Sequence, residues 1–273
     1  MGKFDGILIC TDLDGTLLGS DKKISKENLD AISYFKAEGG YFTFITGRMP
    51  YYSKFVSDAI DPSAPFGFSN GGGLYDHITG EIVWKQPIAP SVIELVRMVD
   101  RQFPDVGIQL TGFHKAYCCK NTPYMERFRE LTKLPYIECD YESFDIEMAK
   151  VLLGTTDENT MEEMIKALNE HPMASEFVFV RSSKTLYEII PKGIGKGTAI
   201  EKLAEHLNLD ISKTIAVGDY ENDISMLKTA GIGIAVENAA EEAKNAADLI
   251  TVSNDDHAIA RIIYDLDTGA IKL

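Results

Sequence analysis

The chain has 273 residues, which is enough for a core domain and a smaller second domain. Hydrophobic residues make up 45% and charged residues 25%, a composition typical of a soluble globular protein. The formal net charge is −15 without a concentrated basic patch, so we expect neither nucleic acid nor an anionic membrane as a partner. No apolar run is long enough to span a bilayer, and the first residues lack the features of a signal peptide, so we expect a cytoplasmic location.

The four cysteines, Cys10, Cys118, Cys119 and Cys139, include no CxxC pair. The adjacent Cys118 and Cys119 are poorly placed to bridge each other or to bind zinc tetrahedrally. We therefore expect reduced, mostly buried thiols. The five histidines are scattered without the spacing of a metal site, and we interpret each as structural or exposed.

The N-terminal segment predicts the start of a doubly wound α/β sheet. Residues 6–12 form an apolar run that ends in Asp12, a pattern typical of a central parallel strand buried on both faces. A helix with Ser25 as its N-cap is expected at 25–38, and a second strand at 41–45. This order of strand, helix and strand begins an open α/β fold.

A separate α+β domain is predicted at residues 86–184, where Pro87 and Pro90 mark a change of organisation. After Pro191 the alternation of strands and helices returns. The simplest interpretation is one α/β core built from residues 1–85 and 185–273, with the second domain inserted between them. The expected elements from 86 onward are helices near 92–99, 122–133, 158–170, 196–207, 222–229 and 239–246, and strands near 107–111, 115–119, 149–153, 176–181, 185–190, 214–217, 232–235 and 248–252.

Asp12 and Asp14 come directly after the first buried strand, in the segment DLDGT. Ligands bind at the carboxyl ends of the strands in open α/β sheets. Asp12 is placed to attack phosphorus and form an aspartyl-phosphate. Asp14 could protonate the leaving oxygen and later deprotonate the attacking water. The alternative for these two residues alone is a solvated Asp-Gly turn.

Two further signals could supply partners for a phosphate group. Thr46 and Gly47 follow the second strand, where a hydroxyl and free backbone N–H groups suit a phosphate oxygen, although Thr46 could simply cap a helix. Lys196 opens a helix, where a cation is unfavourable by about 0.3–1 kcal/mol unless an anion offsets it. Lys196 should neutralise the nucleophile and the phosphate together, although a lysine that points to solvent is also possible.

A metal site is predicted around the segment GDYENDI. Asp219 ends a buried strand, and Asn222 and Asp223 open a helix. Carboxylate oxygens that converge from two strand ends suit a hard cation, and few protein ligands with several waters favour Mg²⁺ over Ca²⁺. Taken alone, Asp223 could also be an ordinary carboxylate at a helix N-terminus.

These motifs and their order resemble the haloacid dehalogenase superfamily of phosphohydrolases, and more narrowly its Cof-type subgroup of sugar-phosphate and cofactor phosphatases. The resemblance rests on DxDGT at 12–16, Thr46 after its strand, Lys196 at a helix start, GDxxND at 218–223, and Ser69-Asn70-Gly71 before the insertion. It implies a Rossmann-like core with an α/β cap domain that supplies specificity.

The same resemblance implies residue roles. Asp12 would be the nucleophile and Asp14 the general acid and base. Mg²⁺ would be held by the carboxylates of Asp12 and Asp219 and by the backbone carbonyl of Asp14, with Asp223 supporting this metal shell. The residues that would contact the phosphate are Thr46, Gly47, Lys196 and Asn222. Arg48 and Tyr220 occupy variable positions of the family and receive no role.

The sequence therefore predicts a Mg²⁺-dependent phosphatase that hydrolyses small phosphorylated metabolites through an aspartyl-phosphate. A phosphomutase of related architecture would return the phosphoryl group to a sugar hydroxyl instead. A regulator that only binds a phosphorylated metabolite is the other alternative, although binding alone does not need both Asp12 and Asp14. A receiver domain would be much shorter, and a P-type pump would need membrane helices.

Overall fold

The computed structural model describes residues 2–132 and 135–273, so residue 133 of the helix predicted at 122–133 lies outside the described part. The chain forms two compact units. The first unit consists of the residues up to Trp84 together with Gly195–Leu273, and the second is Lys85–Ile194. The boundary predicted after residue 184 falls too early, because Leu186–Pro191 forms a strand that pairs within the sheet of the second unit.

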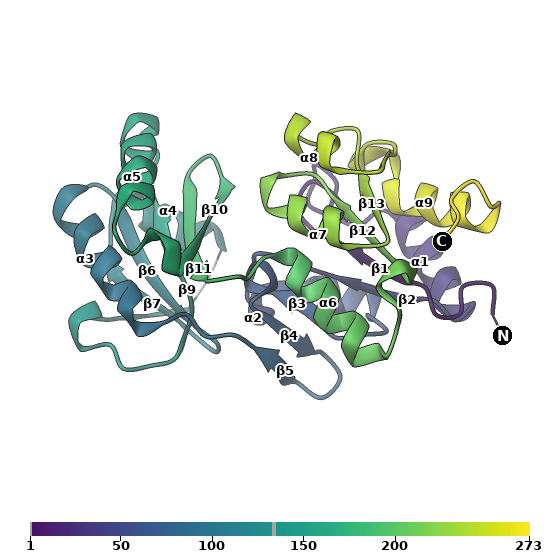
Figure 1. The fold of residues 1–273 in the computed structure, drawn as a ribbon, viewed down its shortest axis with the longest axis horizontal. Coiled ribbons are helices and arrows are strands. Elements are labelled where there is room, and N and C mark those ends of the chain that lie inside the picture. The colour runs from purple at the N-terminus through teal and green to yellow at the C-terminus, as the bar shows by residue number, and fades with distance from the viewer. Residues whose placement is uncertain (1, 133–134) are drawn as a thin grey trace. The chain divides into compact units, whose positions relative to one another are not determined.

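The first unit is built on a five-stranded parallel sheet with the order β14-β13-β12-β1-β2 (Figure 1). All four residues of the central strand β1 are buried, which requires cover on both faces of the sheet. The α/β class predicted from the sequence is confirmed. The strands are β1 (Leu8–Thr11), β2 (Tyr41–Phe44), β12 (Thr214–Gly218), β13 (Ile232–Ala235) and β14 (Leu249–Ile250).

Helices supply the cover for this sheet, with α1 packed against α9 and α6 packed against α7 (Figure 1). Ser25 is the N-cap of α1, as predicted, and its hydroxyl accepts a hydrogen bond from the backbone N–H of Asn28 at 3.2 Å. Ile32 and Phe35 point into the core. The helices are α1 (Lys26–Ala37), α2 (Pro50–Ile60), α6 (Lys196–Leu207), α7 (Ile224–Thr229), α8 (Glu241–Ala246) and α9 (Ala258–Asp267).

A small sheet of order β3-β4-β5 follows α2 in the chain. It consists of β3 (Phe66–Phe68), β4 (Gly73–Asp76) and β5 (Glu81–Lys85). A parallel bridge between Ile45 and Gly67 connects its first strand to the end of β2. The glycine-rich segment between β3 and β4 is thereby held beside the carboxyl edge of the core sheet.

The second unit has a six-stranded sheet of order β10-β11-β9-β6-β7-β8, in which only the pairing of β7 with β8 is parallel among the described strands. Apolar side chains of α3 and α5 pack on one face of this sheet in a single hydrophobic core. Its elements are α3 (Ile93–Gln102), β6 (Gly107–Gly112), β7 (Ala116–Lys120), α4 (Pro123–Thr132), β8 (Tyr136–Glu138), β9 (Met148–Gly154), α5 (Glu158–Glu170), β10 (Phe177–Ser183) and β11 (Leu186–Pro191).

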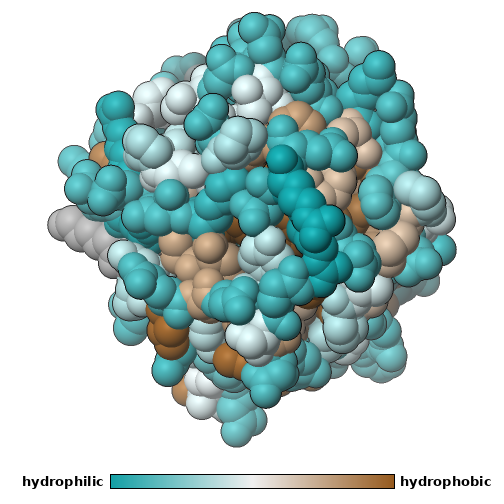
Figure 2. Space-filling model, turned by 90° about the vertical axis from the view of Figure 1, so that its left-hand side faces the viewer, coloured by the Kyte–Doolittle hydropathy of each residue, from teal (hydrophilic) through white to brown (hydrophobic). Residues whose placement is uncertain are grey.

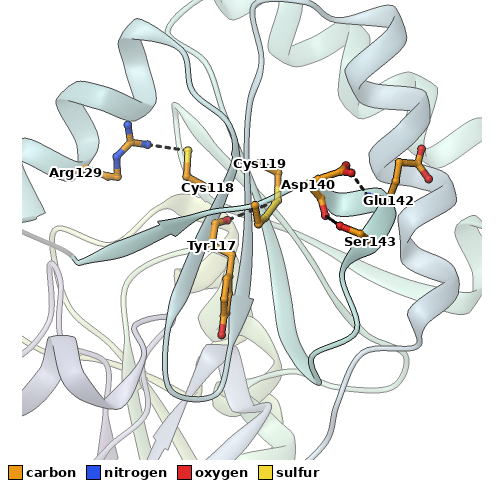
Figure 3. Close-up of a disulfide and its surroundings, with 8 residues drawn as sticks. Tyr117, Cys118, Cys119, Arg129, Asp140, Glu142 and Ser143 are labelled. Atoms are coloured by element: carbon orange, nitrogen blue, oxygen red, sulfur yellow. Dashed lines mark hydrogen bonds between the residues drawn. A yellow bond between two sulfur atoms is a disulfide. The ribbon is translucent and has the colours of Figure 1, made fainter.

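Cys119 and Cys139 form a disulfide in the second unit (Figure 3). The parallel pairing of β7 with β8 brings them together, and the backbone N–H of Cys139 donates to the carbonyl of Cys118 at 3.0 Å. The prediction of reduced thiols is therefore wrong for this pair. Cys10 and Cys118 are free and buried, and the Sγ atom of Cys118 accepts a hydrogen bond from Arg129 at 3.1 Å.

The surface agrees with the acidic, polar composition. Figure 2 shows a face on which hydrophilic residues dominate and hydrophobic residues lie in small, separate groups. Among the helices in the described ranges, none combines the length and the apolar character that crossing a bilayer requires.

The disulfide closes a loop with a sequence separation of 20 residues, so it should restrict the unfolded chain. Replacing Cys119 and Cys139 together by serine should lower the free energy of unfolding by about 3 kcal/mol. Urea unfolding with and without a reductant measures this change, and the double variant should not respond to the reductant. Alkylation of all four cysteines in denatured, unreduced wild-type protein would contradict the bridge.

Candidate active site

Three strand ends meet at one edge of the core sheet because β1 pairs in parallel with both β2 and β12. Thr11, the last residue of β1, is aligned with Phe44 on one side and with Val217 on the other. The residues that follow these strands, Asp12, Thr46 and Asp219, therefore lie at the same edge. The prediction that these distant motifs share one edge of the sheet is confirmed by the register.

A buried ion pair joins the end of β1 to the start of α6. The Nζ atom of Lys196 lies 2.5 Å from Oδ1 of Asp12, and the Lys196 side chain is fully buried. Burial lowers the pKa of Lys196, but the charges of Asp12 and Asp223 outweigh that effect and raise it above its ordinary value. Lys196 is therefore a permanent cation beside Asp12, and it does not point to solvent.

Asp223 is the second partner of Lys196, with Oδ1 at 2.5 Å from Nζ. Its other oxygen, Oδ2, accepts hydrogen bonds from the backbone N–H groups of Asp219 at 2.8 Å and of Tyr220 at 3.0 Å. The side chain is fully buried. Asp223 thus holds both the ammonium group and the turn after β12 in place, and it is more than a solvated carboxylate at a helix start.

The Asp219 carboxylate is held against the loop that follows β1. The hydroxyl of Thr16 donates to Oδ1 of Asp219 at 2.8 Å. Gly15 has a φ of 87°, and a Cβ atom there would lie 2.4 Å from Oδ2 of Asp219. Only glycine permits this approach, because a side chain would need both a strained backbone and the space that the carboxylate fills.

Asp12, Asp219 and Asp223 each offer one oxygen to a cluster whose atoms lie within 4.8 Å of one another, and such a group could hold a metal ion. Burial, reinforced by the negative charges of Asp223 and Asp219, raises the pKa of Asp12 well above its ordinary value, although Lys196 opposes this shift. Burial followed by the charge of Asp223 raises the pKa of Asp219 to about 6. Three carboxylates and one ammonium group leave an excess of negative charge, which a divalent cation would neutralise.

Asp14 does not join this cluster with its carboxylate. Its side chain turns to Arg48, whose Nε and NH2 atoms donate to the two Asp14 oxygens at 2.9 and 2.8 Å. With its carboxylate paired to Arg48, Asp14 can still offer its backbone carbonyl, which is the ligand that the family resemblance implies and which stays a prediction. Arg48 receives no role from the sequence, because it occupies a variable position of the family, and the structure shows it paired with Asp14.

Thr46, Gly47 and Asn222 lie around Asn70. The backbone N–H of Asn70 donates to the carbonyl of Thr46 at 3.0 Å, and Asn222 donates from Nδ2 to Oδ1 of Asn70 at 3.0 Å. A Cβ atom on Gly47 would lie 3.1 Å from the same Oδ1 atom. In the sequence Asn70 stands out only as part of the family pattern, and its positive φ of 54° is a backbone conformation that asparagine adopts more readily than most residues.

The turn that contains Asn70 also approaches the start of α6. Gly71 has a φ of 90°, and a Cβ atom on it would lie 2.0 Å from the carbonyl oxygen of Gly195. The two backbones are in direct contact immediately before Lys196. Sequence reasoning had found Lys196 and Asn70 but not the contact that sets their spacing.

Comparison with known proteins places the chain in a family. Residues 9–263 match the family model described as haloacid dehalogenase-like hydrolase. Two proteins of Bacillus subtilis are each 27% identical: 5-amino-6-(5-phospho-D-ribitylamino)uracil phosphatase YwtE, over 96% of this chain and 98% of the relative, and phosphatase YwpJ, over 95% and 99%.

A solved structure shows the same fold. A haloacid dehalogenase-like hydrolase from Bacteroides thetaiotaomicron superposes with a TM-score of 0.82 at 26% identity, over 95% of this chain and 99% of that one. The family match covers both the DxDGT segment and the segment GDYENDI. The chain therefore belongs to the haloacid dehalogenase-like hydrolases, and it is a phosphatase of that family.

Proposed function

We propose that the protein is a Mg²⁺-dependent phosphatase that hydrolyses small phosphorylated metabolites through an aspartyl-phosphate on Asp12. The observation that carries the proposal is the buried contact of 2.5 Å between Lys196 Nζ and Asp12 Oδ1 at the carboxyl edge of the sheet. A purely structural aspartate gains nothing from a position where burial and two other carboxylates oppose its charge. A nucleophile that must meet an anionic phosphoryl group needs both the cation and the restricted access to water.

The donor set fits Mg²⁺. Carboxylate oxygens are hard ligands, and Mg²⁺ is commonly bound by one or two carboxylates with several waters. The carboxylates of Asp12 and Asp219 and the carbonyl of Asp14 would hold the ion. Asp223 supports Asp219 by accepting a hydrogen bond from the Asp219 backbone N–H. When bound, the ion supplies positive charge against the phosphoryl oxygens.

In the first step, an Asp12 oxygen attacks phosphorus, the bond from phosphorus to the ester oxygen breaks, and Asp14 gives a proton to that leaving oxygen. In the second step, water attacks the phosphorus of the aspartyl-phosphate while Asp14 accepts its proton. The bond to Asp12 then breaks, and inorganic phosphate is released. Lys196 stays ionised throughout and offsets the charge that accumulates around Asp12.

Thr46, Gly47 and Asn222 are proposed to bind the phosphate oxygens together with Lys196. The support is their gathering around Asn70, beside the strand end that carries Asp12. A hydroxyl, a side-chain amide and backbone N–H groups are the donors that a phosphate accepts from.

The substrate class proposed here is a sugar phosphate or another small phosphorylated metabolite. The relative YwtE is named as a phosphatase of 5-amino-6-(5-phospho-D-ribitylamino)uracil, which is such a molecule. The second unit, Lys85–Ile194, is proposed to act as the cap domain that reads the rest of the substrate. A phosphomutase would differ in needing a sugar acceptor for the phosphoryl group.

Substitution of Asp12 by asparagine removes the nucleophile with little change of volume. We expect Asp12→Asn to lower kcat/KM on the order of 10,000-fold, and Asp14→Asn to abolish turnover of poor leaving groups. The measurement is the release of inorganic phosphate from a panel of sugar phosphates and from p-nitrophenyl phosphate. Circular dichroism and the melting temperature serve as controls for the fold.

The same assay separates the alternatives. Phosphate released without a bisphosphate activator excludes the phosphomutase, and any sustained turnover excludes a regulator that only binds. Treatment with EDTA should stop the reaction, and added Mg²⁺ should restore it. Substantial activity in Asp12→Asn, or in the presence of EDTA, would contradict the proposed function.

The carboxylate cluster also predicts a pH dependence of metal binding. Because the pKa of Asp219 is raised to about 6 in the folded protein, its protonated form stabilises the fold below the unfolded value of about 4, and this contribution is lost as the pH rises through 6. Mg²⁺ offsets the negative charge that Asp219 gains when it ionises, so the increase in melting temperature on adding Mg²⁺ should grow between pH 5 and about 7. Thermal melts with and without Mg²⁺ across this range measure it.

The matched control is Asp219→Asn, which keeps the side-chain volume but removes the charge. In this variant the effect of Mg²⁺ on the melting temperature should be smaller and should depend less on pH. An effect of Mg²⁺ that is the same at pH 5 and pH 7 in the wild-type protein would show that this cluster is not where the ion binds.

A further inference from the structure

We propose that Arg48 is a positioning residue for Asp14, one that fixes the position and the plane of its carboxyl group for proton transfer to the leaving oxygen. The inference rests on the proposed function in one respect, which is that Asp14 is the general acid. It concerns residues of the first unit only.

The contact between the two side chains has two points of attachment. Nε of Arg48 donates to Oδ2 of Asp14 at 2.9 Å, and NH2 donates to Oδ1 at 2.8 Å. Such a planar fork sets the position and the plane of the carboxylate, which a single contact cannot do. Within the described part of the chain, Lys22 is the other donor to Asp14, at 3.3 Å, and its side chain is 66% exposed.

Arg48 is itself held in place. Its backbone N–H donates to the hydroxyl of Thr46 at 3.2 Å, and its guanidinium carbon lies 5.6 Å from the centre of the Phe55 ring. Phe55 lies on α2 and is 49% exposed, so burial in the core does not explain it. The contact with the Arg48 guanidinium group explains the position of the Phe55 ring, because an aromatic ring attracts a cation over its face. Phe55, Arg48 and Asp14 thus form a chain of contacts that ends at the acid.

The chemistry of the first step explains why the acid needs this support. Asp14 transfers its proton to the ester oxygen as the bond to phosphorus breaks, and it becomes a carboxylate. A carboxyl group held in one place by the fork meets the ester oxygen in a fixed geometry, so the fork speeds the step only where the leaving oxygen needs a proton. A leaving group that is stable as an anion needs no proton, and for such a substrate the contribution of Arg48 should be small.

This difference can be measured with two substrates of nearly the same shape. Phenyl phosphate has a poor leaving group, whereas p-nitrophenyl phosphate has a good one. We expect Arg48→Ala to lower kcat/KM for phenyl phosphate about tenfold more than for p-nitrophenyl phosphate. The parameter kcat/KM is the right one, because it reports the first step and not the later hydrolysis of the aspartyl-phosphate.

Three further variants sharpen the test. Arg48→Lys keeps the charge without the fork, so it should not restore the ratio of the two kcat/KM values. Phe55→Leu should shift the ratio in the same direction by a smaller factor. Arg261→Ala is the matched control, because Arg261 also pairs with a carboxylate, donating from Nε to the two oxygens of Asp265 on α9 at 3.0 and 2.9 Å, and its loss should leave the ratio unchanged.

An equal loss for both substrates in Arg48→Ala would overturn the proposal, since it would show that Arg48 binds the phosphate group common to them. The absence of any loss of kcat/KM for either substrate would also overturn it, as would full rescue by Arg48→Lys. If Arg48→Ala does not fold, Arg48→Gln and Phe55→Leu decide the question by the same ratio. Failure of the proposed function is distinct, because it would appear as turnover that does not depend on Asp12 or Asp14.

Discussion

The contacts of the buried Lys196 ammonium group with two buried carboxylates organise the whole first unit. Lys196 lies at the start of α6, Asp12 at the end of β1 and Asp223 in the turn after β12, so one cation ties together segments far apart in the chain. Removing the Lys196 ammonium group would leave two buried carboxylates without a counter-charge, at a cost of about 3–5 kcal/mol. The site and the stability of the core are therefore parts of one arrangement, and the carboxylates can be kept close together only because the cation lies between them.

Much of the core could be predicted from the sequence, because its strands are apolar runs that end in polar residues. The segments around Asp12 and Asp219 follow this pattern, and parallel pairing then places them at one edge. Helices α2 and α9 were not predicted. Neither has a side-chain N-cap: α2 starts after Met49, and α9 starts after His257 with a φ of 63°. Without that start signal, their periodic apolar residues did not stand out.

What the sequence could not give was the direction of side chains and the pairing of distant strands. The turn of Asp14 toward Arg48 depends on rotamers that no spacing encodes. The predicted end of the inserted domain at residue 184 leaves out strand β11, and only the pairing of this strand with β9 and β10 shows to which sheet it belongs. The bridge from Cys119 to Cys139 was missed for the same reason, since it depends on the parallel alignment of β7 with β8.

The contact between Gly71 and Gly195 has a consequence for how this protein can vary. Lys196 keeps its place because two backbone segments of the chain touch at Gly71 and Gly195, which have no side chains. A virtual Cβ on Gly71 would lie only 2.0 Å from the Gly195 carbonyl oxygen. A methyl group added there would push the first turn of α6 outward and carry the ammonium group with it. Gly71, a residue without any reactive atom, is thus as constrained as the reactive ones, and its constancy among relatives would record the spacing of backbones rather than any chemistry of its own.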